Sequence, residues 1–238
     1  KFFEQQTSVN FKKTWFLHDH IQNSDTVDID YLKNFEKNYS INLWQLGLNE
    51  RLFYQYNDFY QFSQNEILSI LEKECKLYES ILDEIKPDFL ITSETALHQQ
   101  HLFYELCRKK GIKVLMLNQS KLAYKCIISQ ELHKLDAMPM LSDIPSKGRT
   151  FDELLKILNQ KDNSKQLKLF EKNFGGTNSS KMKAASDYFL KSDNSNMKTH
   201  FSYYGRNKSK VFVDYISKSL KTKKRKSFID KNLEFEIH

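Results

Sequence analysis

Glycine and proline are scarce in this chain, which has six Gly and three Pro among 238 residues. Together they make up about 4% of the sequence, whereas average usage is roughly 12%. Sandwiches and barrels need these residues at their many turns, so the composition favours helices or a helix-rich α/β fold. No GxGxxG or GxxxxGK[ST] pattern occurs, which excludes the common dinucleotide and P-loop fingerprints.

Cysteine and long apolar runs are also rare. The three Cys form no CxxC pair, and their odd number argues against a disulfide framework and for a reducing cytoplasm. The longest strongly apolar run, 114–117, is far shorter than the roughly 20 residues of a membrane span. We therefore expect a cytoplasmic protein, either free in the cytoplasm or at the inner face of the membrane. The sequence begins at Lys1 with neither an initiator Met nor a signal peptide, so we expect it to lie inside a longer gene product.

Aromatic residues are abundant, with 18 Phe, 12 Tyr and 2 Trp, so most of the chain should fold. The formal charge is +7, and its densest cluster is the basic run 221–226. The favoured interpretation of this run is a solvated helix end. An anionic membrane patch and a nucleic-acid contact are the alternatives. The run contains no aromatic side chains that would stack on bases, so we expect no nucleic-acid partner.

Several elements can be predicted from local signals. An apolar stripe predicts a helix from Glu50 through Tyr60. Ser63 with Glu66 indicates a capping box that starts another helix, which must stop before Pro87.

A strand-helix-strand unit follows, with strands at 88–92 and 112–117 and a helix at 96–110 that ends before Gly111. Such a unit predicts parallel strands, and the weak alternation of the second strand predicts a sheet covered on both faces. A further short strand is expected at 125–129. We expect a helix-rich, Rossmann-like α/β domain over residues 1–146, followed by a mostly helical segment over 147–238.

The ends of parallel strands are where ligands gather in such sheets. Ser93, Glu94, Thr95 and His98 follow the first strand, and together they suit a polyol, with Glu94 or His98 as a base. The alternative is that Ser93 or Thr95 caps the helix and Glu94 complements its dipole.

After the second strand, Ser120 and Lys121 are expected to form the companion rim of this site. Two histidine pairs, His18 with His20 and His98 with His101, have ligand-like spacing, but neither has a third ligand fixed by sequence. We therefore predict no metal site.

The same region resembles the N-terminal half of capsular and surface polysaccharide biosynthesis proteins. The resemblance covers about residues 40–135 and is carried by the segments Lys86-Pro87-Asp88-Phe89-Leu90-Ile91-Thr92, Leu102-Phe103-Tyr104-Glu105-Leu106-Cys107, Gly111-Ile112-Lys113-Val114-Leu115-Met116-Leu117, Ser120-Lys121-Leu122 and Ile127-Ile128-Ser129. Lys121 stands where the family pattern has Arg, which disfavours a bidentate anion contact.

This resemblance implies a glycosyltransferase of two Rossmann-like domains that works without a metal or another cofactor. Its N-terminal domain would face a glycan or lipid-linked acceptor, and a second domain beyond His238 would bind the nucleotide-sugar donor. Peripheral membrane contact is a further expected interaction. Two alternatives stay open: a basic binding module for nucleic acid or another anionic partner, and a non-catalytic Rossmann-like scaffold.

Overall fold

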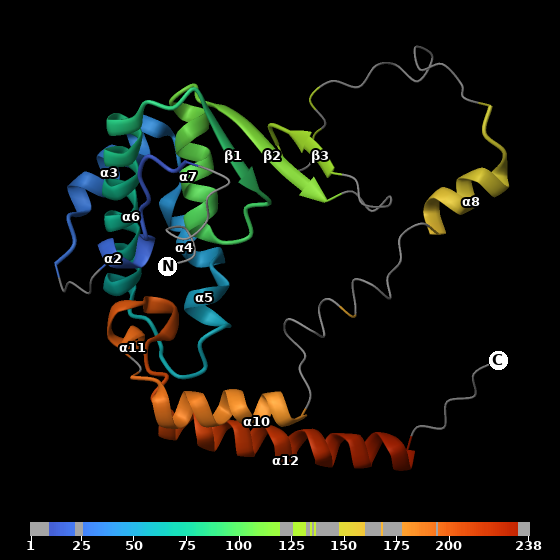
Figure 1. The fold of residues 1–238 in the computed structure, drawn as a ribbon. Helices are drawn as coiled ribbons and strands as arrows, with labels where there is room; N and C mark the ends of the chain where they lie inside the picture. Colours follow the sequence, from blue (N-terminus) through green and yellow to red (C-terminus); the bar gives the residue numbers. More distant parts are fainter. Residues whose placement is uncertain are drawn as a thin grey trace.

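The chain is a helix-rich α/β protein (Figure 1). The computed structural model describes residues 10–21, 26–119, 126–131, 134, 136, 148–159, 168, 178–193 and 195–232. Its elements are α2 (Leu17–His20), α3 (Ile29–Tyr39), α4 (Leu43–Asn49), α5 (Arg51–Tyr54), α6 (Gln64–Ile85), β1 (Phe89–Ser93), α7 (His98–Lys109), β2 (Lys113–Gln119), β3 (Cys126–Ser129), α8 (Phe151–Asn159), α10 (Asn178–Ser186), the π-helix η3 (Asp187–Lys191), α11 (Asn196–Thr199), the 3-10 turn η4 (Phe201–Tyr203) and α12 (Lys208–Asn232).

Helix α6 is the central element, and its two ends confirm the sequence signals. Ser63 Oγ accepts a hydrogen bond from the Glu66 N–H at 3.2 Å, and Glu66 Oε2 accepts one from the Ser63 N–H at 2.8 Å. This capping box satisfies two N–H groups that would otherwise lack partners at the helix start. At the other end, Lys86 adopts a left-handed conformation with φ of 47° directly before Pro87. The helix therefore stops where proline was expected to stop it.

The main core surrounds α6, against which α2, α3, α4 and α7 pack (Figure 1). The side chains of Leu71 and Cys75 on α6 are fully buried, as is Leu102 on α7. Leu71 and Cys75 are four positions apart and so lie on one face of α6, and burial of apolar surface holds α6 and α7 together.

The sheet confirms the strand-helix-strand prediction in part. β1 pairs with β2 in parallel, as expected, but β3 pairs with β2 in antiparallel orientation, so the sheet is mixed. One face is covered, since Val114 and Met116 are each only 1% exposed. On the other face Ile91 is 61% exposed and Ile128 58% exposed. The expectation that both faces are covered is therefore wrong for the described residues.

The helix expected from Glu50 through Tyr60 is wrong beyond its first turn, because α5 ends at Tyr54. The reason lies in Asn57. Its Oδ1 accepts a hydrogen bond from the Phe59 N–H at 3.1 Å, which forms a local turn, and its Nδ2 donates to the Tyr204 carbonyl at 2.9 Å. A contact with a distant part of the chain thus replaces the helix.

Residues 201–204 belong to this same core. Phe201 is fully buried and packs against Phe53 of α5, and Tyr204 is 5% exposed and packs against Tyr60 and Phe62 just before α6. The division into segments 1–146 and 147–238 stays a prediction, but at least one turn of the later segment completes the core of the earlier one.

Gly205 holds this turn in place, and we expect Gly205→Ala to lower the free energy of unfolding by about 2 kcal/mol. Its φ is +76°, and a Cβ there would lie only 2.4 Å from the Phe59 carbonyl oxygen. The matched control is Gly111→Ala, because Gly111 has φ of +77° and no atom within 4 Å of an added Cβ. Gly111→Ala should lose only about 1 kcal/mol in urea unfolding. Equal losses in the two variants would show that the close approach to Phe59 is unimportant.

Candidate functional site

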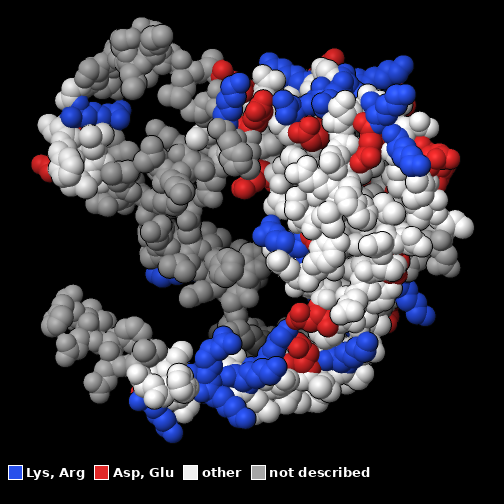
Figure 2. Space-filling model, turned by 180° about the vertical axis from the view of Figure 1, so that it is seen from behind, with Lys and Arg blue, Asp and Glu red and all other residues white. Residues whose placement is uncertain are grey.

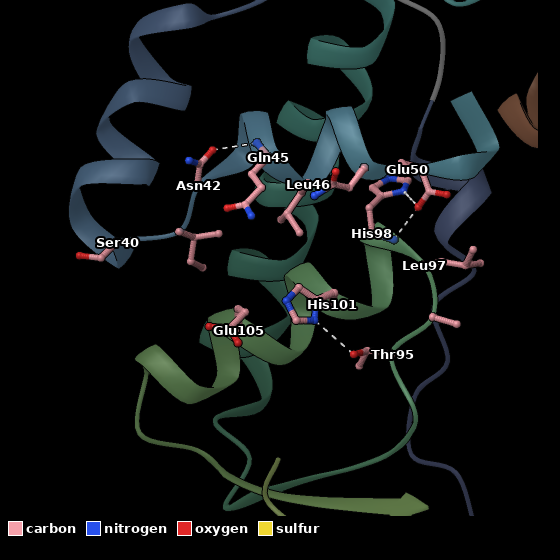
Figure 3. Close-up of a pocket in the computed structure, with 13 residues that line it drawn as sticks. Ser40, Asn42, Gln45, Leu46, Glu50, Thr95, Leu97, His98, His101 and Glu105 are labelled. Atoms are coloured by element: carbon pink, nitrogen blue, oxygen red, sulfur yellow. Dashed lines mark hydrogen bonds and ion pairs between the residues drawn. The ribbon is translucent and has the colours of Figure 1, made fainter. Parts of the chain in front are cut away.

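A polar pocket of about 460 Å³ lies beside the start of α7, next to the loop that follows strand β1 (Figure 3). One wall is α4 with the turn before it, and the other is formed by the β1–α7 loop and the first two turns of α7. Amides, hydroxyls, carboxylates and imidazoles line it together with four apolar residues: Ser40, Ile41, Asn42, Gln45, Leu46, Asn49, Glu50, Thr95, Ala96, Leu97, His98, His101 and Glu105. The volume falls in the range of small-molecule sites.

The α4 wall is positioned by a cap and a close helix contact. Asn42 precedes the helix, and its Oδ1 accepts a hydrogen bond from the Gln45 N–H at 2.8 Å. Gly47 lets α4 approach α6, because a Cβ at this position would lie 3.2 Å from Ile67 Cγ2. The residues on the other side of α4, including Gln45, are thereby presented to the pocket (Figure 3).

The opposite wall is fixed by hydrogen bonds from the β1–α7 loop to helices α7 and α5. Thr95 Oγ1 lies 3.2 Å from His101 Nδ1, which ties the loop to the first turn of the helix. The Ala96 N–H donates to Gln100 Oε1 at 3.2 Å, and the Ala96 carbonyl accepts from the Arg51 guanidinium at 3.5 Å. His101 and Thr95 point toward one another at the rim in Figure 3.

A buried triad of Glu50, His98 and Glu74 lies behind this surface. His98 Nδ1 is 2.6 Å from Glu50 Oε2, and His98 Nε2 is 3.1 Å from Glu74 Oε1. The side chains of all three are almost completely inaccessible, at 1% for His98, 2% for Glu50 and 0% for Glu74. Glu50 also accepts the His98 backbone N–H at 2.6 Å and the Leu52 N–H at 2.7 Å. One carboxylate therefore caps the beginnings of both α5 and α7.

The triad holds a proton on His98. Burial acts to lower the pKa of His98, but the charge of Glu74 and the hydrogen bonds to both carboxylates outweigh it and raise the pKa to about 9. Burial acts to raise the pKa of Glu50, but hydrogen bonds from the His98 ring and from the His98 and Leu52 N–H groups lower it overall. At neutral pH the imidazolium donates from both ring nitrogens, so neither nitrogen is available as a base.

The predicted site residues have different positions. Thr95 and His98 line the pocket, but Ser93 and Glu94 are exposed and are not among its lining residues. Ser120 and Lys121 lie outside the described residues. The role of Glu94 stays a prediction, whereas the protonated state of His98 argues against its predicted role as a base.

The sequence reasoning missed Gln45, Glu50, His101 and Glu105 as pocket residues. His101 and Glu105 are one helical turn apart on α7, so the same face that drew attention to His98 also carries them. The His101 Nε2 atom has no hydrogen-bond partner among the described residues, and Glu105 is partly exposed with Arg108 Nη1 3.5 Å away. Gln45 and Glu50 had no comparable signal, because α4 and α5 meet α7 only in the folded chain.

The histidine pairs considered as metal ligands are used in other ways. His98 contacts carboxylates through both nitrogens, and the ring of His18 stacks on His200 with centroids 4.4 Å apart. Within the described ranges, no group of three or more His, Cys, Asp or Glu side chains is arranged to hold a metal ion.

Comparisons with known proteins add no relationship: protein-family models, curated proteins and solved structures all give no match to this chain.

Proposed function

We propose that this chain is the acceptor-binding half of a glycosyltransferase for surface polysaccharide, with a Rossmann-like arrangement around β1 and β2. The observation that carries the proposal is the polar pocket beside the loop after parallel strand β1. In open α/β sheets, ligands bind beyond the carboxyl ends of parallel strands. The nucleotide-sugar donor would be bound by a second domain, and the acceptor would be a glycan or a lipid-linked sugar.

The chemistry of the pocket supports a polyol ligand. A sugar presents many hydroxyl groups, each of which donates and accepts hydrogen bonds. The pocket offers amide groups from Asn42 and Gln45, a hydroxyl from Thr95 and a carboxylate from Glu105. These groups suit hydroxyls without requiring a charged ligand. Glu50 and His98 are hydrogen-bonded to each other, so we assign them the role of holding the pocket wall in place.

Transfer to an acceptor hydroxyl needs a base close to that hydroxyl. We propose His101 for this role, because Thr95 orients its ring through Nδ1 and its other nitrogen is left for the acceptor. Glu105 on the next turn would stabilise the imidazolium that forms. Glu94 stays the alternative base. In a transfer assay that includes the donor domain, His101→Gln should abolish most activity while Glu94→Gln should not; the opposite pattern would favour Glu94.

Binding can be tested with this chain alone, by calorimetry against a panel of neutral and acidic mono- and disaccharides. Thr95→Val and Gln45→Leu keep side-chain size but each remove hydrogen-bonding groups, so each should weaken saccharide binding about fivefold to tenfold. The matched control is Gln64→Leu, since Gln64 is exposed at the start of α6 and lies outside the pocket lining. Binding that is equally strong in all variants would place the sugar elsewhere, and the absence of saturable binding to any saccharide would refute the proposal.

A further inference from the structure

The positive charge of the protein is concentrated on α12. This 25-residue helix contains nine of the 37 Lys and Arg residues of the chain but only two of its 30 Asp and Glu residues. The remainder of the chain therefore has 28 residues of each sign, and the entire excess of +7 resides on α12. In Figure 2 the blue side chains along α12 form a band at the bottom of the view, whereas blue and red are mixed over the upper part of the molecule.

One side of α12 faces the rest of the protein. Lys218 Nζ lies 2.8 Å from Asp58 Oδ2, and Val211 and Asp214 line a cavity together with Phe59. At roughly 100° per residue, positions 211, 214 and 218 lie on one side of a helix. This side attaches α12 to the segment between α5 and α6.

The opposite side of α12 carries an apolar stripe exposed to solvent. Val213, Ile216 and Leu220 follow the i, i+3, i+7 spacing of one helix face and are 65%, 42% and 56% exposed. No residue of α12 is buried. A stripe of this kind has no role in the core, so its apolar surface is available to something outside the described chain.

Basic side chains continue this outer side toward the end of the helix. Lys223 and Lys224 follow the stripe at helical spacing, within the run Lys221-Thr222-Lys223-Lys224-Arg225-Lys226. In the described part of the chain, none of the five basic residues of this run forms an ion pair. The second half of α12 also extends past the end of α10 (Figure 1), so it projects from the body of the protein.

We propose that the outer face of α12 docks on the surface of an anionic lipid bilayer. The stripe of Val213, Ile216 and Leu220 lies at the boundary of the acyl chains, and Lys223 and Lys224 contact headgroup phosphates. A helix that presents apolar and basic side chains on the same face binds a membrane through buried apolar area and charge attraction together. Nucleic acid would use the charge but not the stripe, because aliphatic side chains do not stack on bases. Across the residues that the structure describes, no helix is long and apolar enough to cross a bilayer, so α12 lies on the surface.

Cosedimentation of the full 238-residue chain with vesicles tests this inference. Binding is expected to vesicles of phosphatidylcholine mixed with phosphatidylglycerol, to weaken as salt rises, and to be absent with phosphatidylcholine alone. The variant Lys223→Ala/Lys224→Ala should bind roughly 25-fold more weakly, since each basic residue near such a surface contributes about a factor of five. A control that removes the same charge from exposed positions elsewhere, Lys33→Ala/Lys37→Ala, should change binding less than threefold.

The stripe is tested separately by Ile216→Gln/Leu220→Gln, which keeps good helix formers and the charge of α12. This variant should also lose most vesicle binding, and circular dichroism should show unchanged helix content. Equal vesicle binding by the basic-run variant and its charge-matched control would overturn the inference. Retention of binding in the stripe variant, or tighter binding to duplex DNA than to anionic vesicles at the same salt, would also overturn it. The inference does not depend on the sugar-binding proposal, and either can fail alone.

Discussion

Replacing His98 with alanine is expected to lower the free energy of unfolding by about 3–5 kcal/mol, because two buried carboxylates lose their shared cation. Glu50 and Glu74 are almost fully inaccessible, and His98 lies between them. Urea unfolding followed by circular dichroism measures the loss. His20→Ala is the matched control, since His20 is exposed and should change stability by less than about 0.5 kcal/mol.

A second substitution separates charge from packing. If the loss in His98→Ala comes from an unpaired carboxylate, adding Glu74→Gln should restore part of the stability, because one buried negative charge is removed. If the loss comes only from the cavity left by the imidazole, adding Glu74→Gln should not help. An effect in His98→Ala no larger than that in His20→Ala would show that the triad contributes little to stability.

The free energy of unfolding should fall as the solution becomes mildly alkaline. The pKa of His98 rises from its ordinary value of 6.5 in the unfolded chain to about 9 in the folded protein. A group whose pKa is raised by folding contributes stability that is complete below the unfolded value and is lost as the pH rises through the folded value. The contribution of His98 is therefore present below pH 6.5 and lost through pH 9, a change of about 3 kcal/mol.

Glu50 acts in the opposite direction. Its pKa is lowered below the ordinary value of 4.5, so its contribution is present above that value and lost as the pH falls. The triad should thus stabilise the fold most between pH 4.5 and 6.5. Urea unfolding across this range and up to pH 9 measures the profile, with His98→Gln as the reference. The difference in stability between the native chain and His98→Gln should shrink as the pH rises; a constant difference would contradict the assigned proton.

Local signals predicted the parts of the fold that depend on neighbouring residues. Ser63 and Glu66 form their capping box within one turn, and Gly111 ends α7 in a left-handed conformation with φ of 77°. The parallel pairing of β1 and β2 followed from the strand-helix-strand order. Each of these features is encoded within a few residues or one connection, so a single sequence is enough to reveal it.

The predictions that failed concern contacts between residues that are far apart in the chain. Glu50 and His98 are separated by 48 positions, and no local pattern indicates that Glu50, just before α5, and Glu74, on α6, lie on both sides of the imidazole. The helix predicted beyond Tyr54 is broken by Asn57, whose bond to Tyr204 spans 147 positions. For the site, Thr95 and His98 both line the pocket, but only the folded chain shows that His98 lies between two buried carboxylates and that His101 is bonded to Thr95.

An NMR titration of the 15N-labelled chain with saccharides shows whether the pocket between α4 and α7 binds a sugar. We expect saturable shifts of the backbone amides of Gln45, Thr95 and His101, which line the pocket, with little change at Ile91 and Ile128 on the exposed face of the sheet. Saturable shifts that map to the exposed sheet face, with the pocket amides unmoved, would contradict it.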